Sequence, residues 1–146
     1  MKYYLDANFL ASYFISNHEK NNISTKKMAE ILASNSEIDI STLTMDETWW
    51  VIFKHLKTNS EPFSDFYEDY KKVFSKLKSI SECVFIQFSD LENGISLALD
   101  YINKFNLRPR DAFHFAIIDE QKLDCIVTFD TYFNSIRNKS FQICVL

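Results

Sequence analysis

The chain has 146 residues, of which 47% are apolar and 25% charged, so residues 1–146 are expected to form a single globular domain. There are 16 Lys and Arg against 20 Asp and Glu. The formal net charge of −4 excludes a protein held to nucleic acid by charge alone. No apolar run is long enough to span a membrane. Gly94 is the only glycine, which excludes Gly-rich phosphate loops and dinucleotide fingerprints.

The three cysteines, Cys83, Cys125 and Cys144, each lie in an apolar run and lack metal-ligand spacing. Their placement predicts buried thiols in a reducing compartment. The first residues also lack the long apolar segment of a secretory signal. We therefore expect a cytoplasmic protein.

The chain begins with a predicted strand at 2–5, followed by a segment at 7–15 whose apolar spacing is compatible with a helix. An amphipathic helix is expected at 24–34, with Ser24 or Thr25 as its N-cap. Each of these elements places apolar residues on one side. They are therefore expected to cover a common core.

A second strand is predicted at 38–42 by its alternation, and a helix is expected to open at Thr44. Pro62 marks the start of a long helix. One face of this helix is expected to carry Phe63, Phe66, Tyr67, Tyr70, Phe74 and Leu77. The rest of the chain predicts, in order, strand 83–88, helix 91–105 capped by Ser89 or Asp90, buried helix 110–121, strand 124–129 and strand 141–146. This alternation predicts an α/β fold, a three-layer α/β/α sandwich around a mostly parallel central sheet.

Four acidic residues occupy related positions in this pattern. Asp6 and Asp130 follow strands directly, Glu47 lies shortly after a strand, and Asp111 is in the first turn of the buried helix. The carboxyl ends of parallel strands form the crevice where such sheets bind ligands, so the four carboxylates are expected to meet there. Gathered carboxylates repel one another unless a cation neutralises them. Oxygen ligands alone favour Mg²⁺ or Mn²⁺.

Each acid also has a purely structural explanation. Thr44 and Glu47 match a capping box, in which Glu47 returns to the Thr44 amide. Asp111 would complement the positive end of its helix, and Asp6 and Asp130 would serve as N-caps. For each acid taken singly, the sequence does not decide between a structural role and a role in the metal site.

Four segments resemble, in order, the acidic motifs of PIN-domain nucleases: YLDANFL at 4–10, Thr-x-x-Glu at 44–47, RPRDAFHFA at 108–116 and IVTFDTYF at 126–133. The resemblance spans nearly the whole chain. It implies an endoribonuclease whose catalytic and metal-binding residues are Asp6, Glu47, Asp111 and Asp130. It also implies that Asn8 and Thr128 support the site. A glycine common before the fourth strand in that family is replaced here by Lys122-Leu123.

The resemblance also implies partners. Many stand-alone proteins of this kind are VapC-like toxins, so we expect an RNA substrate, a small antitoxin protein and a homodimer. Arg108 and Arg110 flank the third acid and are the best candidates to contact RNA phosphate, although pairing with nearby acids explains them equally well. His114 could share a metal role with Asp111, but a core histidine is the preferred interpretation. Trp50 should be exposed, because helix geometry turns it away from Trp49.

Two other classes of protein share part of this pattern. A haloacid-dehalogenase-like phosphatase also places an acid after its first strand, but it normally has a second Asp two residues later, where Asn8 stands. The second is a catalytically silent PIN-like module that only binds RNA or protein. Such a module typically loses acids, and this chain keeps all four. Metal-dependent hydrolysis of RNA, with a metal-bound water attacking the phosphorus, is therefore the preferred prediction.

Overall fold

The structure is a computed structural model that describes residues 1–57, 61–136 and 140–146. Within these residues one five-stranded sheet has the order β3-β2-β1-β4-β5, and all four neighbouring pairs are parallel. The strands are β1 (Lys2–Leu5), β2 (Glu37–Ser41), β3 (Cys83–Ile86), β4 (Cys125–Thr128) and β5 (Gln142–Val145). All five expected strands are present, though most are shorter than predicted.

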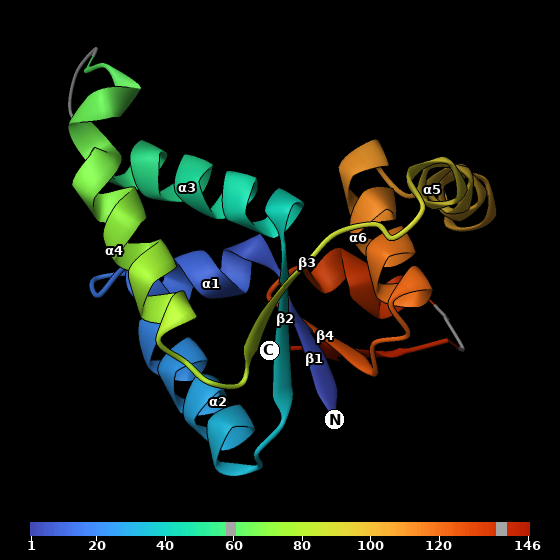
Figure 1. Cartoon of the computed structure of the whole chain (residues 1–146), viewed down its shortest axis with the longest axis horizontal. Helices are drawn as coiled ribbons and strands as arrows, with labels where there is room; N and C mark the ends of the chain where they lie inside the picture. The colour runs from blue at the N-terminus through green and yellow to red at the C-terminus, as the bar shows by residue number, and fades with distance from the viewer. Residues whose placement is uncertain (58–60, 137–139) are drawn as a thin grey trace.

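Helices cover both faces of the sheet (Figure 1). One face carries α1 (Ala7–Phe14), α2 (Asn21–Ala33), α3 (Thr42–Leu56) and α4 (Tyr67–Lys78), the last preceded by a 3-10 turn, η1 (Phe63–Phe66). The other face carries α5 (Leu91–Phe105) and α6 (Pro109–Glu120), and a second 3-10 turn, η2 (Thr131–Ser135), follows β4. The predicted three-layer α/β/α sandwich is confirmed. The assignment of residues 1–146 to a single domain stays a prediction.

The sheet has a switch point between β1 and β4. The chain adds β2 and then β3 on one side of β1, crosses the other face through α5 and α6, and places β4 on the opposite side of β1. Connections that leave β1 and β4 therefore turn to opposite faces of the sheet. A crevice forms at the carboxyl ends of strands at such a point, and ligands bind there in open α/β sheets.

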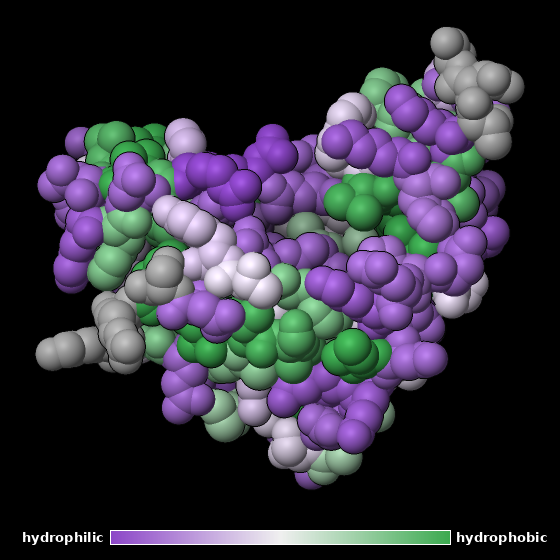
Figure 2. Space-filling model, turned by 180° about the vertical axis from the view of Figure 1, so that it is seen from behind, coloured by the Kyte–Doolittle hydropathy of each residue, from purple (hydrophilic) through white to green (hydrophobic). Residues whose placement is uncertain are grey.

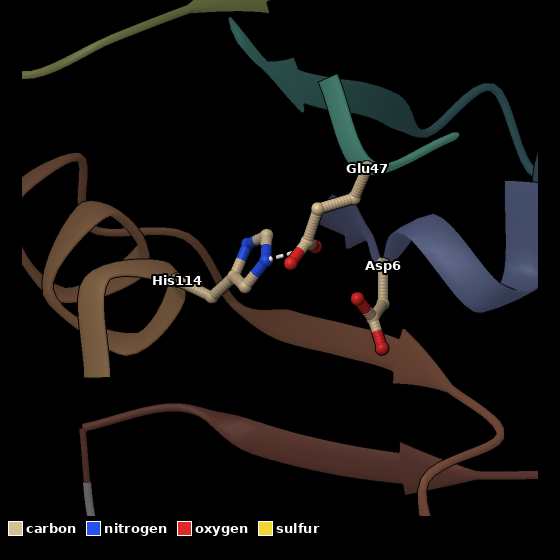
Figure 3. A group of neighbouring side chains, drawn as sticks. All are labelled: Asp6, Glu47 and His114. Atoms are coloured by element: carbon tan, nitrogen blue, oxygen red, sulfur yellow. Dashed lines mark hydrogen bonds and ion pairs between the residues drawn. The ribbon is translucent and has the colours of Figure 1, made fainter. Parts of the chain in front are cut away.

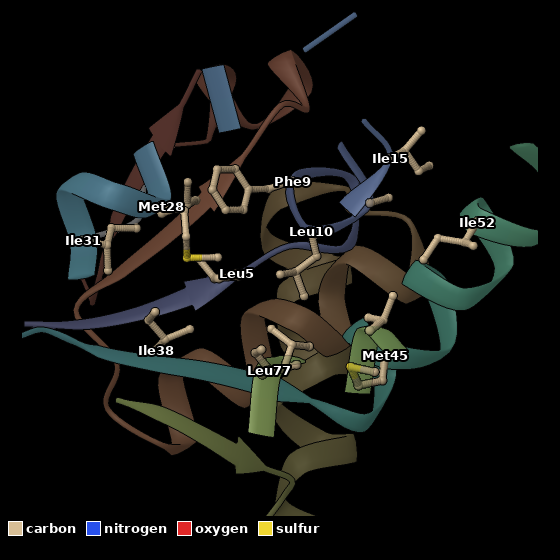
Figure 4. Packing of buried hydrophobic residues seen from close by; sticks show 14 of the residues in the cluster. Leu5, Phe9, Leu10, Ile15, Met28, Ile31, Ile38, Met45, Ile52 and Leu77 are labelled. Atoms are coloured by element: carbon tan, nitrogen blue, oxygen red, sulfur yellow. The ribbon is translucent and has the colours of Figure 1, made fainter. Parts of the chain in front are cut away.

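Two apolar clusters hold the layers together. On the α1–α4 face, Leu5 of β1 packs with Phe9 and Leu10 of α1 and with Leu77 of α4 (Figure 4). On the opposite face, the neighbouring β1 residue, Tyr4, packs with the α5 and α6 residues of a second cluster. This alternation follows from the pleat, which turns successive side chains of a strand to opposite faces.

The predicted starts of two helices are wrong. Helix α2 begins at Asn21, with Lys20 at its N-cap, and Ser24 lies in the first turn with its hydroxyl donating to the Lys20 and Asn21 carbonyls. Helix α3 begins at Thr42, because the hydroxyl of Ser41 caps it by accepting from the Thr44 amide at 3.0 Å. For α5, Asp90 is the N-cap, as one of the two alternatives predicted.

The predicted stripe at 63–77 is only partly correct. Phe66 and Leu77 are buried, but Tyr67 and Phe74 are exposed, and Val73 lies in the core instead. The difference arises within α4 itself, which buries the face of Val73 and Leu77 and leaves the face of Tyr67 and Phe74 exposed. No helix in the described part of the chain is long and apolar enough to cross a membrane.

The turn before β4 contains a strained residue. Lys122 adopts a φ of 53°, in the left-handed region, at the position where the resembling family commonly has glycine. Its amide donates to the Asp119 carbonyl at 3.1 Å, which closes the turn after α6. The substitution therefore changes a turn at the opposite end of α6 from Asp111.

Candidate functional site

Three potential ligand groups from distant parts of the chain meet at the switch point. Asp6 follows β1, Glu47 lies in the second turn of α3, and His114 lies on α6 (Figure 3). One ligand atom from each residue lies within 4.8 Å of the others. His114 Nε2 is 2.7 Å from Glu47 Oε2. Asp6 and Glu47 thus converge as predicted, and His114, which the sequence favoured as an ordinary core residue, is buried but contacts the site directly.

Asp6 is held in a fixed orientation. Its side chain is only 8% exposed, Oδ1 accepts from the Ala7 amide at 2.7 Å, and Oδ2 accepts from the Thr128 hydroxyl at 2.6 Å. Burial raises the pKa of Asp6, while the neighbouring His114 and the two hydrogen bonds act in the opposite direction. A buried carboxyl with a raised pKa binds a proton or a cation more readily than a solvated one.

Asn8 and Thr128 join the ends of β1 and β4. The Asn8 carboxamide Nδ2 donates to Thr128 Oγ1 at 3.2 Å, and its Oδ1 accepts from the Phe129 amide at 3.0 Å. Thr128 Oγ1 also accepts from the Asp130 amide at 2.9 Å. Both residues therefore fix the backbone that carries Asp6 and Asp130. The role of Asn8 and Thr128 in supporting a catalytic site stays a prediction.

Asp111 and Asp130 form a second acidic pair, bridged by one arginine. Arg108 Nε lies 2.7 Å from Asp111 Oδ2, and its NH2 nitrogen lies 2.9 Å from Asp130 Oδ2. Arg110 pairs with Glu47, with 3.1 Å between Nε and Oε1. The two arginines expected to contact RNA thus neutralise three of the four acids. Arg108 contacts both members of the Asp111–Asp130 pair, and Arg110, two residues further on, contacts Glu47.

Of the purely structural explanations of the acids, one is wrong and two are correct. The capping-box interpretation of Glu47 is wrong, because Ser41 caps α3 and the Glu47 carboxylate contacts His114 and Arg110. Asp6 and Asp130 do cap α1 and η2, where Asp130 Oδ1 accepts from the Tyr132 amide. A cap uses one carboxylate oxygen. The other oxygen of each residue faces Thr128 or Arg108.

Sequence reasoning missed a buried network behind His114. Tyr4 of β1 places its hydroxyl 2.6 Å from His114 Nδ1 and 2.6 Å from Ser41 Oγ, and it accepts from Thr44 Oγ1 at 2.9 Å. All four side chains are buried. Burial raises the pKa of Tyr4 well above its ordinary value, so the phenol keeps its proton. A signal was available in Ser41 and Thr44, two hydroxyl residues at the junction of β2 and α3.

The donor set fits a divalent cation. Asp6 and Glu47 supply carboxylate oxygens within reach of one ion, and Asp111 and Asp130 each supply an oxygen that contacts Arg108. Arg108 and Arg110 place positive charge beside these acids, as a bound metal ion would. Hard oxygen ligands of this kind suit Mg²⁺ or Mn²⁺. Seen from behind, the surface is hollowed between the two groups of helices, and hydrophilic residues line much of the hollow (Figure 2).

An aromatic surface lies on α3 beside the site. Trp50 is 43% exposed, as predicted, and its ring contacts Phe53 and the exposed Phe63. Nearby, a cavity of about 390 Å³ opens between the end of α1, α3 and α4. Its lining residues include Phe14, Ile15, Ile52, Leu56 and Val73. The α1–α4 side thus presents both a groove and an exposed aromatic cluster.

Solved structures share this fold. VapC20 of Mycobacterium tuberculosis, a sarcin-ricin loop cleaving toxin, is similar with a TM-score of 0.64 and 13% identity, over 91% of this chain and 93% of its own. VapBC2 of Rickettsia felis, bound to a DNA fragment from its promoter, is similar with a TM-score of 0.66 and 16% identity, over 100% of this chain and 99% of its own. FitAB bound to an IR36 DNA fragment is similar with a TM-score of 0.59 and 12% identity, over 97% of this chain and 92% of its own.

At these identities the structural likeness shows the fold alone. A search of curated proteins found no match to the chain. The sequence itself provides the stronger assignment. The family model described as the PIN domain matches residues 3–139, and this range includes all four acids and both supporting residues. The chain therefore belongs to the PIN domain family.

Proposed function

We propose that the protein is a Mg²⁺- or Mn²⁺-dependent endoribonuclease whose catalytic residues are Asp6, Glu47, Asp111 and Asp130. The observation that carries the proposal is the meeting of Asp6 and Glu47 at the switch point of the sheet, where Arg110 is the counter-charge of Glu47. Arg108 holds the other two acids, Asp111 and Asp130, together at the start of α6 and the end of β4. Membership of the PIN domain family and the similarity to VapC20 support the same assignment.

In this proposal the four carboxylates hold the metal ions, and Asn8 and Thr128 keep Asp6 and Asp130 in place. A bound divalent ion lowers the pKa of water and neutralises charge on the phosphate, which enables in-line attack on the phosphodiester. Arg108 and Arg110 leave the carboxylates when the ion binds. Both side chains are largely exposed, so they can then turn to RNA phosphate.

The phosphatase alternative loses support from the role of Asn8. Its carboxamide hydrogen-bonds Thr128 and the Phe129 amide, so both ends of the side chain are engaged in joining β1 to β4. A second acid two residues after Asp6, as that class normally has, would place another negative charge in this position. Phosphomonoester turnover would nevertheless identify it directly.

The test is metal-dependent cleavage of a mixed RNA. Wild-type protein should cut RNA with Mg²⁺ or Mn²⁺ and not with EDTA, and Asp111→Asn should abolish cutting. The amide can still accept from Arg108, so the metal-free melting temperature of Asp111→Asn should change little. Asp65→Asn, an exposed acid on η1, is the matched control and should cleave like wild type. Cleavage retained in Asp111→Asn would refute the site, whereas folded wild-type protein that never cleaves would favour the silent module.

We also propose that the protein is the toxin of a toxin–antitoxin pair. VapBC2 and FitAB are solved as complexes of this fold, and the exposed Trp50 and Phe63 rings offer an apolar surface to a helical segment of a small antitoxin. Expression alone should arrest growth, and expression of Asp6→Asn at equal protein level should not. Equal growth of the two strains would instead favour a housekeeping ribonuclease. The expected homodimer stays a prediction, to be tested by sedimentation.

A further inference from the structure

Glu47 is connected to the start of its own helix by a buried hydrogen-bond chain that passes through two other elements. Ser41, the N-cap of α3, contacts the Tyr4 hydroxyl of β1, which contacts Nδ1 of His114 on α6. His114 Nε2 then contacts Glu47 Oε2, one turn further along α3. The chain thus fixes the relative positions of β1, α3 and α6 at the point where the acids gather.

The hydrogens of this chain can be assigned at its ends. A carboxylate only accepts, so Nε2 of His114 carries the hydrogen of the 2.7 Å contact with Glu47. In the neutral imidazole, Nδ1 then accepts from the Tyr4 hydroxyl. The phenolic oxygen in turn accepts from Thr44, and Ser41 can donate to it as well. Every polar group in the chain is satisfied, as burial requires.

The two oxygens of Glu47 therefore have unlike partners. Oε2 faces His114, which is 2% exposed and cannot leave without breaking the network. Oε1 faces Arg110, whose side chain is 59% exposed and free to move into solvent. A metal ion can therefore replace Arg110 at Oε1 easily, whereas replacing His114 at Oε2 would be costly.

We propose that Tyr4 and His114 are positioning residues, which hold Glu47 by Oε2 so that Oε1 is presented to the divalent ion when Arg110 moves away. This inference rests on the proposed metal-dependent function. His114 does not itself ligate the ion, because the Nε2 lone pair is unavailable while that nitrogen donates to Glu47. Groups that orient a ligand in this way typically change metal affinity 10- to 100-fold when they are removed.

The experiment measures the dissociation constant of Mn²⁺ by electron paramagnetic resonance of the free ion, together with the metal-free melting temperature. We expect His114→Phe to weaken Mn²⁺ binding about 10- to 100-fold and Tyr4→Phe about 10-fold. His114→Gln should recover most of the affinity, because its amide can donate to Oε2. Ser24→Ala, which removes a buried hydroxyl from α2, is the control and should leave the constant unchanged.

Three results would contradict the inference, each in a distinct way. If Tyr4→Phe lowers the melting temperature but binds Mn²⁺ like wild type, the network is only structural. If His114→Gln binds Mn²⁺ as poorly as His114→Phe while Tyr4→Phe binds normally, His114 is a direct ligand. If folded wild-type protein binds no Mn²⁺, the proposed function itself fails. Tyr4→Phe preserves the ring, so it keeps the test decisive should His114→Phe not fold.

Discussion

Arg110 Nε lies 3.1 Å from Glu47 Oε1, so an arginine of α6 stands beside an acid of α3 where a cation is expected. Because the guanidinium and the metal compete for the same carboxylate, Arg110→Gln should bind Mn²⁺ a few-fold more tightly. The same variant should have a higher KM for RNA, since it loses a phosphate contact. Its metal-free stability should fall by less than about 1 kcal/mol, because the guanidinium of Arg110 is largely exposed and water screens its pairing with Glu47.

Titration of Mn²⁺ and steady-state cleavage at saturating metal separate the two effects of Arg110→Gln. Lys71→Gln removes an exposed ion pair with Glu68 on α4, which involves none of the four acids, and serves as the control. It should change neither quantity. Weaker Mn²⁺ binding by Arg110→Gln would show that Arg110 helps to organise the site and does not compete with the ion.

Thr128 offers a second test, because one hydroxyl serves three groups. It donates to Asp6 Oδ2 and accepts from Asn8 Nδ2 and the Asp130 amide. Thr128→Val should lower the free energy of unfolding by about 1–3 kcal/mol, since it leaves these buried groups without their partner. It should also weaken Mn²⁺ binding. Thr128→Ser keeps the hydroxyl and should restore both, as monitored by urea unfolding and metal titration.

Asp39 should make stability depend on pH. It is 1% exposed in β2, and its Oδ2 has no hydrogen-bond partner among the described residues. Burial, helped by Glu37 and Asp124 and opposed by Lys2, raises its pKa from 3.8 to about 6. Between these values the folded state binds more protons than the unfolded state, so stability falls as pH rises through this window.

Asp39→Asn removes this titration. We expect the variant to gain roughly 1–3 kcal/mol in the free energy of unfolding at pH 8 and little at pH 4. Cleavage of RNA should be unchanged, because the groups that interact with Asp39 lie toward the amino ends of the strands, away from the acidic site. Denaturant unfolding at several pH values provides the measurement. A gain of equal size at both pH values would contradict the assignment.

Lys122 can be replaced to relieve backbone strain. A left-handed conformation costs a residue with a side chain roughly 1–2 kcal/mol, and glycine avoids this cost although its unfolded state is more flexible. Lys122→Gly should therefore raise the free energy of unfolding by roughly 0.5–1 kcal/mol without altering cleavage. Asn106→Gly, at a φ of 53°, should gain less, since asparagine tolerates this region. Thermal unfolding of both variants tests the difference.

The sequence predicted the fold and the acids because both follow from local patterns. Strand ends, apolar periodicity and the positions of Asp6 and Asp130 are readable within a few residues of each site. The start of α2 could not be predicted from such local patterns, because Lys20 provides no side-chain cap that would mark it. The buried face of α4 was also misplaced, because the exposed Tyr67 and Phe74 lie seven residues apart and so repeat with the period of a buried helical stripe.

The role of His114 was beyond reach for a different reason. Its partner Tyr4 lies 110 positions away, and Glu47 lies 67 positions away. An apolar segment around a histidine is the same whether the imidazole merely fills space or links a phenol to a carboxylate. The same limit applies to Glu47, whose capping-box pattern is local, whereas Arg110 and His114 reach it from α6.

The parallel pairing of β1 with β4 has a consequence for the order of folding. The bond from Thr128 to Asp6 spans 122 positions, and pairings between such distant segments form slowly because a long loop must close first. A growing chain that ends before β4 holds Asp6, Glu47 and His114 but lacks both Thr128 and Asp130. The acidic site is therefore incomplete until β4 has entered the sheet.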